Sequence, residues 1–407
     1  MILIKNGKVI ENNKLVKKDV LISFGVIDKI EDEINPNCEM LSGYEILDAE
    51  GCLVMPGAVD VHVHLREPGY EYKETIETGT LSAAKGGVTT IMSMPNLNPV
   101  PDNLEALNLQ IERIKASAKV NVYPYGAVTV NQQDQVRADI EGFYDKVLAI
   151  TDDGRGVNNL EILEEAMHLA KKYNLVIASH AEDNVYKFAP EGEYVAVRRE
   201  IEMVKRIGCR YHFCHMSTKE SFDAIRQAQQ EGYTNITCEV APHHLVLNEE
   251  MIIDGNWKMN PPLRSEVNRL ATIEALIDGT ACMVASDHAP HSIEEKTNPV
   301  YSKNLNGIIG LETMLPIIYT EFVKTNLISL DKFLDVMVYN PIKVFNLPNR
   351  EFKVGAVADI AVIDIENSHV YTKDEILSKG INSPFIGKEY YGFTKYTLVD
   401  GNVVYRK

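Results

Sequence analysis

Short apolar segments recur between residues 55 and 345, and longer amphipathic helical stretches separate them. Such alternation is typical of repeated strand–helix units around a parallel sheet, and eight units favour a (β/α)8 barrel. The candidate strands are Val59–Leu65, Thr89–Met94, Val120–Val128, Val147–Asp152, Leu175–Ser179, Tyr211–Met216, Ile236–Val240 and Cys282–Ser286. We therefore predict an α/β fold whose main domain is a TIM barrel.

Residues of the types that bind metals follow the ends of these strands. In such a barrel the carboxyl ends of the strands meet at one mouth, where the chemistry takes place. The candidate ligands are His62, His64, Asp153, His180, His215 and Asp287. A single one could be a packed histidine or part of an ordinary turn, but their joint placement predicts a metal site.

The motif His62-Val63-His64-Leu65-Arg66 carries the first part of that site. In an extended strand, residues two apart point to the same side, so its two imidazoles and the guanidinium are expected to form one row. Two neutral nitrogen ligands followed by a cation suit a divalent metal beside an anionic substrate group. A half-buried strand that merely carries two histidines is the alternative for this motif taken alone.

Four histidines and two carboxylates exceed the needs of one ion, which favours two divalent ions with a bridging carboxylate. We expect the first ion on His62, His64 and Asp287, the second on His180 and His215, and Asp153 between them. These ligand types suit zinc, with manganese, cobalt and iron left open. The ions would supply a bridging hydroxide, and Asp287 could accept its proton and pass it to a leaving nitrogen. The predicted reaction is hydrolysis of an amide.

Both ends of the chain have strand patterns, and we expect them to form one small β-sandwich domain, although two separate sheets stay open. Asn6-Gly7 and Gly25 predict hairpin turns near the start, and Asp400-Gly401 predicts one near the end. The expected boundaries are 1–54 and 346–407 for the β domain and 55–345 for the catalytic barrel.

Composition narrows the class of protein. The net charge of −17 argues against nucleic acid as a partner, so an anionic substrate must be held by local cations or metal ions. The six cysteines lack CxxC spacing, which fits reduced thiols in a cytoplasmic protein. We find neither a signal peptide pattern nor an apolar run long enough to span a membrane, and we expect no membrane partner.

A series of motifs follows in one order along the whole chain. It comprises Asp60-Val61-His62-Val63-His64-Leu65-Arg66-Glu67-Pro68-Gly69, Met94-Pro95-Asn96, Thr151-Asp152-Asp153-Gly154, Cys214-His215-Met216-Ser217-Thr218, Glu239-Val240-Ala241-Pro242-His243-His244-Leu245, Asn260-Pro261-Pro262-Leu263-Arg264 and Asp287-His288-Ala289-Pro290-His291. With these motifs the chain resembles dihydroorotases of the larger bacterial type, in the amidohydrolase superfamily. Leu-Arg-Glu-Pro-Gly and Asn-Pro-Pro-Leu-Arg separate that family from other cyclic amidases.

The resemblance implies reversible cyclisation of N-carbamoyl-L-aspartate to (S)-dihydroorotate plus water, in de novo pyrimidine (UMP) biosynthesis. It implies two zinc ions per subunit on the ligands given above, with Asp153 as the bridge, Asp152 as its hydrogen-bonding neighbour or the less favoured bridge, and Asp287 as the catalytic residue. The implied substrate-binding residues are His64, Arg66, Asn96, Asn260, His291, Asn306 and Gly307. A homodimer is a family-level expectation, and association with an aspartate transcarbamoylase is an open question.

One departure and two alternatives accompany the resemblance. The family commonly has Phe-Gly where this chain has Asn306-Gly307, so substrate contacts of that loop are expected to differ. The first alternative is another cyclic amidase, such as an allantoinase or hydantoinase, with the same metals but without the carboxylate-binding set of Arg66, Asn96 and His291. The second is a non-catalytic scaffold of the same fold, which the complete ligand set disfavours. His243 and His244 are interpreted as structural, and Cys214 as a buried thiol.

Overall fold

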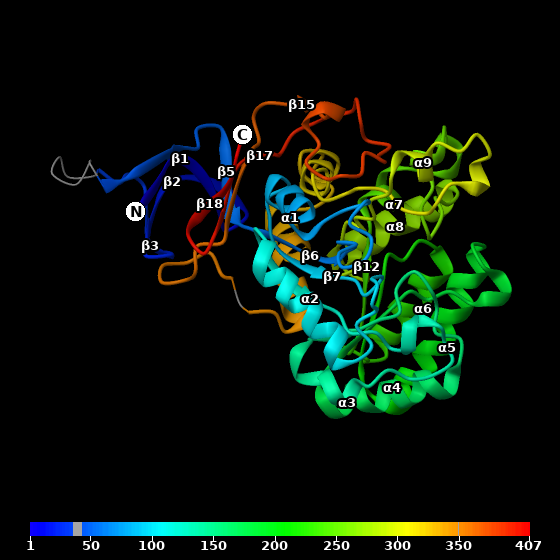
Figure 1. The fold of residues 1–407 in the computed structure, drawn as a ribbon. Coiled ribbons are helices and arrows are strands. Elements are labelled where there is room, and N and C mark those ends of the chain that lie inside the picture. The colour runs from blue at the N-terminus through cyan, green and yellow to red at the C-terminus, as the bar shows by residue number, and fades with distance from the viewer. Residues whose placement is uncertain (36–42, 349) are drawn as a thin grey trace.

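A computed structural model describes residues 1–35, 43–348 and 350–407 of the chain (Figure 1). Cys38 lies outside these residues. The five cysteines in the described part are free thiols, as their spacing predicted.

Eight strands of the central region pair in parallel and overlap the eight predicted segments, which confirms the α/β class. They are β6 (Ala58–Val63), β7 (Val88–Ser93), β8 (Asn121–Pro124), β9 (Ala149–Ile150), β10 (Val176–Ser179), β11 (Arg210–Phe213), β12 (Ile236–Val240) and β13 (Met283–Val284). Pairing follows chain order, in one sheet from β6 to β8 and in another from β9 to β13. Parallel bridges Gly126–Ile150 and Val63–His288 connect the two sheets at both ends.

Helices α1 to α8 lie between the parallel strands, and helices α9 to α12 follow the last of them. They are α1 (Ile76–Lys85), α2 (Leu104–Ser117), α3 (Ile140–Phe143), α4 (Leu160–Tyr173), α5 (Pro190–Ile207), α6 (Lys219–Gln230), α7 (Pro242–Val246), α8 (Glu266–Asp278), α9 (Ile293–Lys296), α10 (Met314–Ile318), α11 (Leu330–Leu334) and α12 (Asn340–Phe345). π-Helical turns at Tyr319–Val323 and Asp335–Tyr339 extend α10 and join α11 to α12. Helices α4, α5, α6 and α8 pack in succession around the strands (Figure 1).

Local sequence sets where these helices begin and end. Thr75 and Thr78 form a capping box at the start of α1, which satisfies backbone N–H groups that lack helical partners. Helix α5 starts with Pro190 in its first turn and stops at Gly208, whose left-handed backbone favours glycine.

The two ends of the chain join in one mixed sheet of eight strands, on the left in Figure 1. Its strands are β1 (Ile2–Glu11), β2 (Lys14–Ser23), β3 (Val26–Glu31), β4 (Glu45–Asp48), β5 (Cys52–Pro56), β14 (Ile360–Asp364), β17 (Phe393–Val399) and β18 (Asn402–Arg406). Antiparallel pairing of β5 with β14 connects the N-terminal strands to the C-terminal ones. The C-terminal strands therefore rejoin the N-terminal strands within a single sheet.

The hairpin predicted at Asn6-Gly7 is wrong. Strand β1 continues through these residues with an irregularity in its register, and the chain turns at Asn12 and Asn13. Gly7 is required by packing, since a Cβ atom there would lie 2.4 Å from Cγ2 of Val54. The turns predicted at Gly25 and Asp400-Gly401 are confirmed between β2 and β3 and between β17 and β18.

The segment between β14 and β17 packs on the central region. It contains the short antiparallel pair β15 (His369–Val370) and β16 (Glu389–Tyr390). Its side chains Tyr371 and Phe385 share a buried cluster with Trp257 and Ile308. The C-terminal part of the chain thus reaches the loops that follow the parallel strands.

No helix in the described part of the chain is both long enough and apolar enough to cross a membrane.

Candidate active site

The six predicted metal ligands come together at the carboxyl ends of the parallel strands, and each is at most 7% exposed. Each lies on or just after its strand: His62 on β6, His64 after β6, Asp153 after β9, His180 after β10, His215 after β11 and Asp287 after β13. The strand ends therefore place side chains far apart in the sequence into one buried group.

Two of these ligands, and Arg66 beside them, have unusual backbone conformations that set the direction of their side chains. Arg66, His215 and Asp287 have φ angles of 62°, 36° and 49°, in the left-handed region that non-glycine residues seldom adopt. The predicted extended row is thus wrong at its third member, because β6 ends at Val63 and the chain turns before Arg66. The guanidinium still lines the same cavity as His64.

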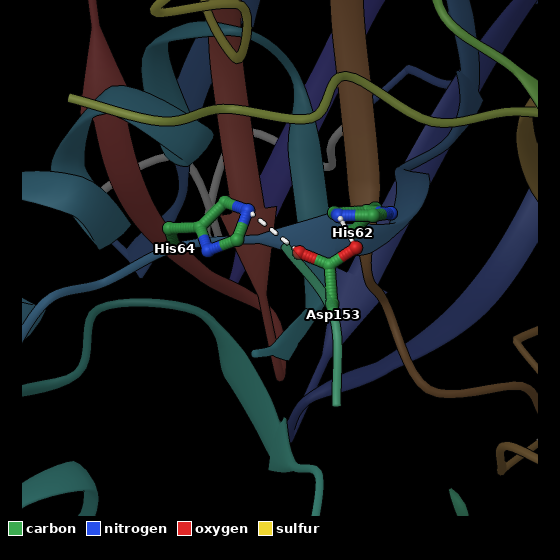
Figure 2. Close-up of side chains that lie close together, drawn as sticks. All are labelled: His62, His64 and Asp153. Carbon is green, nitrogen blue, oxygen red and sulfur yellow. Dashed lines mark ion pairs between the residues drawn. The ribbon is translucent and has the colours of Figure 1, made fainter. Parts of the chain in front are cut away.

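Asp153 lies between His62 and His64. Its Oδ1 is 3.3 Å from Nε2 of His62, and its Oδ2 is 3.4 Å from Nε2 of His64 (Figure 2). Oδ1 of Asp287 lies 3.1 Å from Nε2 of His64 and 3.4 Å from Nε2 of His62. Two imidazoles and two carboxylates therefore face a common point.

A second group shares the same aspartate. Oδ1 of Asp153 is 3.3 Å from Nε2 of His215 and 3.5 Å from Nδ1 of His180. Ligand atoms of these three residues lie within 4.8 Å of one another, as do those of His62, His64 and Asp153. Asp153 is thus the residue common to both groups.

The carboxylate of Asp152 is engaged in hydrogen bonds away from the candidate metal ligands. Its carboxylate accepts hydrogen bonds from the N–H groups of Val128 and Thr129 and from the Thr129 hydroxyl. Burial raises its pKa to about 6. These contacts agree with its interpretation as a hydrogen-bonding neighbour.

The electrostatics of the centre favour a positive charge. Burial by itself lowers the pKa of His62, but the carboxylates of Asp153 and Glu239 outweigh it and raise that pKa well above its ordinary value. The pKa of His180 also rises, to about 9, because hydrogen bonds to Asp153 and Glu182 outweigh burial. Nε2 of His62 is buried without a hydrogen bond within the described residues, so its ring nitrogen is available for a cation. The residues present therefore fit a metal ion.

Sequence reasoning missed the role of Glu239 on β12. Its Oε1 is 2.7 Å from Nδ1 of His62, and its Oε2 is 3.0 Å from Nε2 of His212. A carboxylate at Nδ1 orients the ring and leaves Nε2 toward the centre, as is common for metal-binding histidines. The available signal was its position near the carboxyl end of β12.

The neighbouring thiol and histidines fit their structural interpretations. Burial raises the pKa of Cys214, which keeps the thiol protonated. Burial lowers the pKa of His244 to about 4, and its Nε2 donates to the carbonyl of Pro261. His243 is buried and its pKa lies well below the ordinary value, so this ring is neutral.

A cavity of about 390 Å³ opens beside the centre, and we call it the substrate pocket. All seven predicted substrate-binding residues line it, together with Asp153 and Asp287: His64, Arg66, Asn96, Asn260, His291, Asn306 and Gly307. Asn260 Nδ2 lies 3.0 Å from His180 Nε2, which connects the pocket to the second ligand group.

His291 is held as a neutral imidazole. Burial, and then the charges of Arg66 and Lys73, lower its pKa to about 3. Its Nε2 donates to the carbonyl of Asn306 over 2.7 Å. The loop that departs from the family pattern is therefore connected to the substrate pocket through a backbone carbonyl, which a phenylalanine at this position would also offer.

Comparisons with known proteins agree with this site. A family model described as Dihydro-orotase-like matches residues 51–190. A dihydroorotase of Listeria monocytogenes serovar 1/2a is 44% identical, with 100% of this chain and 99% of the relative covered. A dihydroorotase of Fusobacterium nucleatum is 40% identical over 99% of this chain and 98% of the relative.

Solved structures with similar folds include hydantoinases and dihydropyrimidinases. An L-hydantoinase (dihydropyrimidinase) from Arthrobacter aurescens has a TM-score of 0.89 and 26% identity, and the match covers 100% of this chain and 96% of that one. A dihydropyrimidinase from Brevibacillus agri matches with a TM-score of 0.86 over 99% of this chain and 95% of that chain, at 23% identity. With full-length identity of 40–44% to curated dihydroorotases, the chain belongs to the dihydroorotase family of cyclic amidohydrolases.

Proposed function

We propose that this protein is a dihydroorotase, which interconverts N-carbamoyl-L-aspartate and (S)-dihydroorotate plus water in de novo pyrimidine (UMP) biosynthesis. The observation that carries the proposal is full-length identity of 40–44% to relatives with that name. The gathering of the implied substrate-binding residues around one cavity supports it.

The proposed cofactor is a pair of zinc ions. His62, His64 and Asp287 would hold one ion, His180 and His215 the other, and Asp153 would bridge them. When bound, zinc lowers the pKa of a water molecule and polarises a carbonyl oxygen. Nε2 of buried His62, which makes no hydrogen bond within the described residues, and the histidine groups that share Asp153 support this assignment.

Asp287 is proposed to carry the proton. Burial opposes its ionisation, but His62 and His64 outweigh burial and keep its pKa below the usual range, so the carboxylate can accept a proton. In ring closure the carbamoyl nitrogen bonds to the side-chain carboxyl carbon, and one carboxylate oxygen gains a proton and leaves as hydroxide, which a further proton from solvent converts to water. Asp287 would take the proton from the nitrogen and give it to that oxygen, and the reverse reaction would retrace these steps.

The substrate's second carboxylate would bind to Arg66, with Asn96 and His291 beside it. Within the part of the chain that the structure describes, the Arg66 side chain donates only through Nε, to the carbonyl of Pro290 at 3.3 Å, which leaves the other guanidinium N–H groups for an anion. Asn260 and the Asn306-Gly307 loop would contact the ring. A cation is needed here because Asp153 and Asp287 line the same cavity.

Turnover of dihydroorotate, allantoin and hydantoin at matched concentrations tests the proposal. We expect ring opening of dihydroorotate to dominate, and Asp287→Asn to lower kcat by at least about 100-fold. Preference for allantoin or hydantoin would replace dihydroorotase by another cyclic amidase. Protein without bound zinc that also gains no activity on zinc addition would favour the non-catalytic scaffold.

For the fold, we propose that the eight parallel strands close into a (β/α)8 barrel of residues 55–345. The bridges at both ends of the two parallel sheets support closure. We propose further that residues 1–54 and 346–407 form a β-sandwich domain. The mixed sheet is strongly curved, because Val26 at the β3 edge bridges to Val357 just before β14, and β3 and β14 share a core cluster.

We further propose a cytoplasmic homodimer on the family resemblance alone. Light scattering after size-exclusion chromatography tests the dimer, and co-purification with an aspartate transcarbamoylase tests that association. A monomer at micromolar concentration would refute the dimer.

A further inference from the structure

A second polar cavity adjoins the substrate pocket, and we call it the outer hollow. Its volume is about 430 Å³, and Arg66, Asn96 and Arg155 line both it and the substrate pocket. The two cavities therefore meet at these three side chains. The sequence motifs indicate roles for Arg66 and Asn96 but none for Arg155.

The lining of the outer hollow is unusual for this chain. The whole chain has 58 acidic and 41 basic residues, yet the described residues that line the hollow include Arg66, Lys73 and Arg155 and no Asp or Glu. Most of the remaining polar lining residues are Asn and Gln, whose amide N–H groups donate to anions. The hollow is thus a local cationic site on an acidic protein.

The two arginines keep their charge available. Lys73 pairs with Glu295 at 3.0 Å, whereas neither arginine forms an ion pair within the described residues. The Nη1 of Arg155 donates to the carbonyl of Gln132 over 3.3 Å, and this is its only side-chain hydrogen bond in that part of the chain. Most of the five guanidinium N–H donors of Arg155 can therefore bind an anion.

The backbone fixes Arg155 relative to the candidate metal centre. It stands two residues after Asp153, and its N–H donates to the carbonyl of Asp152 over 3.1 Å. Gln132, which accepts from Arg155, also donates to the carbonyl of Asp153 over 3.3 Å. The guanidinium is thus held at the boundary between the hollow and the pocket.

We propose that the outer hollow is a binding site for small dicarboxylates, and that Arg155 captures the substrate dianion there before it enters the substrate pocket. The inference rests on the proposed function for the identity of the anion, which carries two carboxylates. Charge explains the arrangement: a surface of net charge −17 repels a dianion at long range, and a local cationic site offsets that repulsion.

The test compares Arg155→Ala and Arg155→Lys with the parent protein in two measurements. Calorimetry with succinate as the probe reports binding of a dicarboxylate without turnover. Steady-state kinetics with N-carbamoyl-L-aspartate at low and high salt reports capture during catalysis. Arg206→Ala is the control, since it removes the same charge from a residue that pairs with Glu164 on the outer helices.

For Arg155→Ala we expect about fivefold weaker succinate binding and about fivefold lower kcat/KM at low salt, with kcat nearly unchanged. The kinetic effect should fall below about twofold in 1 M salt, where the Debye length is about 3 Å. Arg155→Lys should retain most of both values, and Arg206→Ala should match the parent.

Parent-like succinate binding by Arg155→Ala, or no succinate binding by the parent, would overturn the inference. A parent that binds succinate through Arg155 but does not turn over the substrate would instead refute the proposed function and leave the anion site standing. The two failures are therefore distinguishable.

Discussion

At the scale of single residues, the candidate metal centre depends on buried carboxylates that are not ligands themselves. Glu239 is 1% exposed and contacts the rings of both His62 and His212. Burial opposes its ionisation, but these two histidines lower its pKa to about 2. An ionised carboxylate in this position sets the orientation and tautomer of His62.

Glu239→Gln is expected to weaken zinc binding about 10- to 100-fold, because a neutral amide orients His62 less strongly. Competition with a chromophoric chelator measures this affinity without any assay of turnover. Glu200→Gln is the matched control, since Glu200 is equally buried but accepts from Ser179 and Tyr211 and contacts no candidate ligand. Equal zinc affinity of both variants would refute the role of Glu239.

The ionisation of Glu295 makes the free energy of unfolding depend on pH. Burial opposes its ionisation, yet Lys73 and the N–H of Ser292 lower its pKa to about 2, below the ordinary value of 4.5. Because the folded-state pKa is depressed, the stabilisation is present above pH 4.5 and is lost as the pH falls toward 2. We expect Glu295→Gln to lower the free energy of unfolding by about 1 kcal/mol at pH 7.

Urea denaturation over a pH series checks this prediction. The difference between parent and Glu295→Gln should shrink steadily below pH 4.5. Glu366→Gln, which removes a more exposed pair with Lys8, should change stability much less. A Glu295→Gln difference that stays constant down to the acid limit of folding would contradict the assignment.

At the scale of elements, the segment between β14 and β17 and helix α9 both form hydrogen bonds with the Asn306-Gly307 loop. Asn382 is 1% exposed; its Nδ2 donates to the carbonyls of Ala289 and Gly307, and its Oδ1 accepts from the N–H of His291. From α9, Nζ of buried Lys296 donates to the carbonyls of Leu305 and Gly307, each over 2.8 Å. Hydrogen bonds from two separate elements thus fix Gly307 and the loop around it.

Asn382→Ala is expected to raise KM for dihydroorotate about tenfold while kcat changes less, because it loosens substrate-binding residues and leaves the metal ligands intact. Asn402→Ala is the control at the exposed start of β18, where the side chain donates, within the described residues, only to the carbonyl of Asp400. Steady-state kinetics with zinc content determined in parallel makes the comparison. Loss of zinc, or a fall in kcat with unchanged KM, would contradict this role.

At the scale of the whole molecule, strands from both chain ends form one sheet beside the parallel strands (Figure 1). Core residues of this sheet come from β1 to β5, β14 and β17. Neither chain end can therefore bury its apolar side chains without the other.

Leu398→Ala is expected to destabilise the protein by about 2–5 kcal/mol, because the fully buried side chain would leave a cavity in that shared core. KM for dihydroorotate should stay within about twofold of the parent, since the sheet does not line the substrate pocket. Leu270→Ala, at a position 52% exposed, is the matched control. Chemical denaturation alongside kinetics makes the measurement, and an unchanged free energy of unfolding would refute the shared core.

The order of strands, the identity of the ligand-type residues and the family could be predicted from the sequence. These follow from local rules: apolar segments of strand length bounded by helical patterns, and His62, His64, His180 and Asp287 placed where those segments end. The motif around Asn260 could be assigned to substrate contact only through the family resemblance, because it lies on a loop whose path local sequence does not set.

Only the tertiary structure decided how distant residues meet. Glu239 pairs with His62 across 177 positions and Asn382 with Ala289 across 93, and no local pattern encodes such contacts. Arg66 is a second example. Alternation along a strand predicts that His62, His64 and Arg66 point to the same side, but β6 ends at Val63 and Arg66 has a left-handed φ angle. Periodicity in the sequence indicates which side of a helix or strand is buried. The hydrogen-bond partners of a side chain, the turns that follow a strand and the charges around a site arise only when the elements pack, because they depend on distances between segments far apart in the chain.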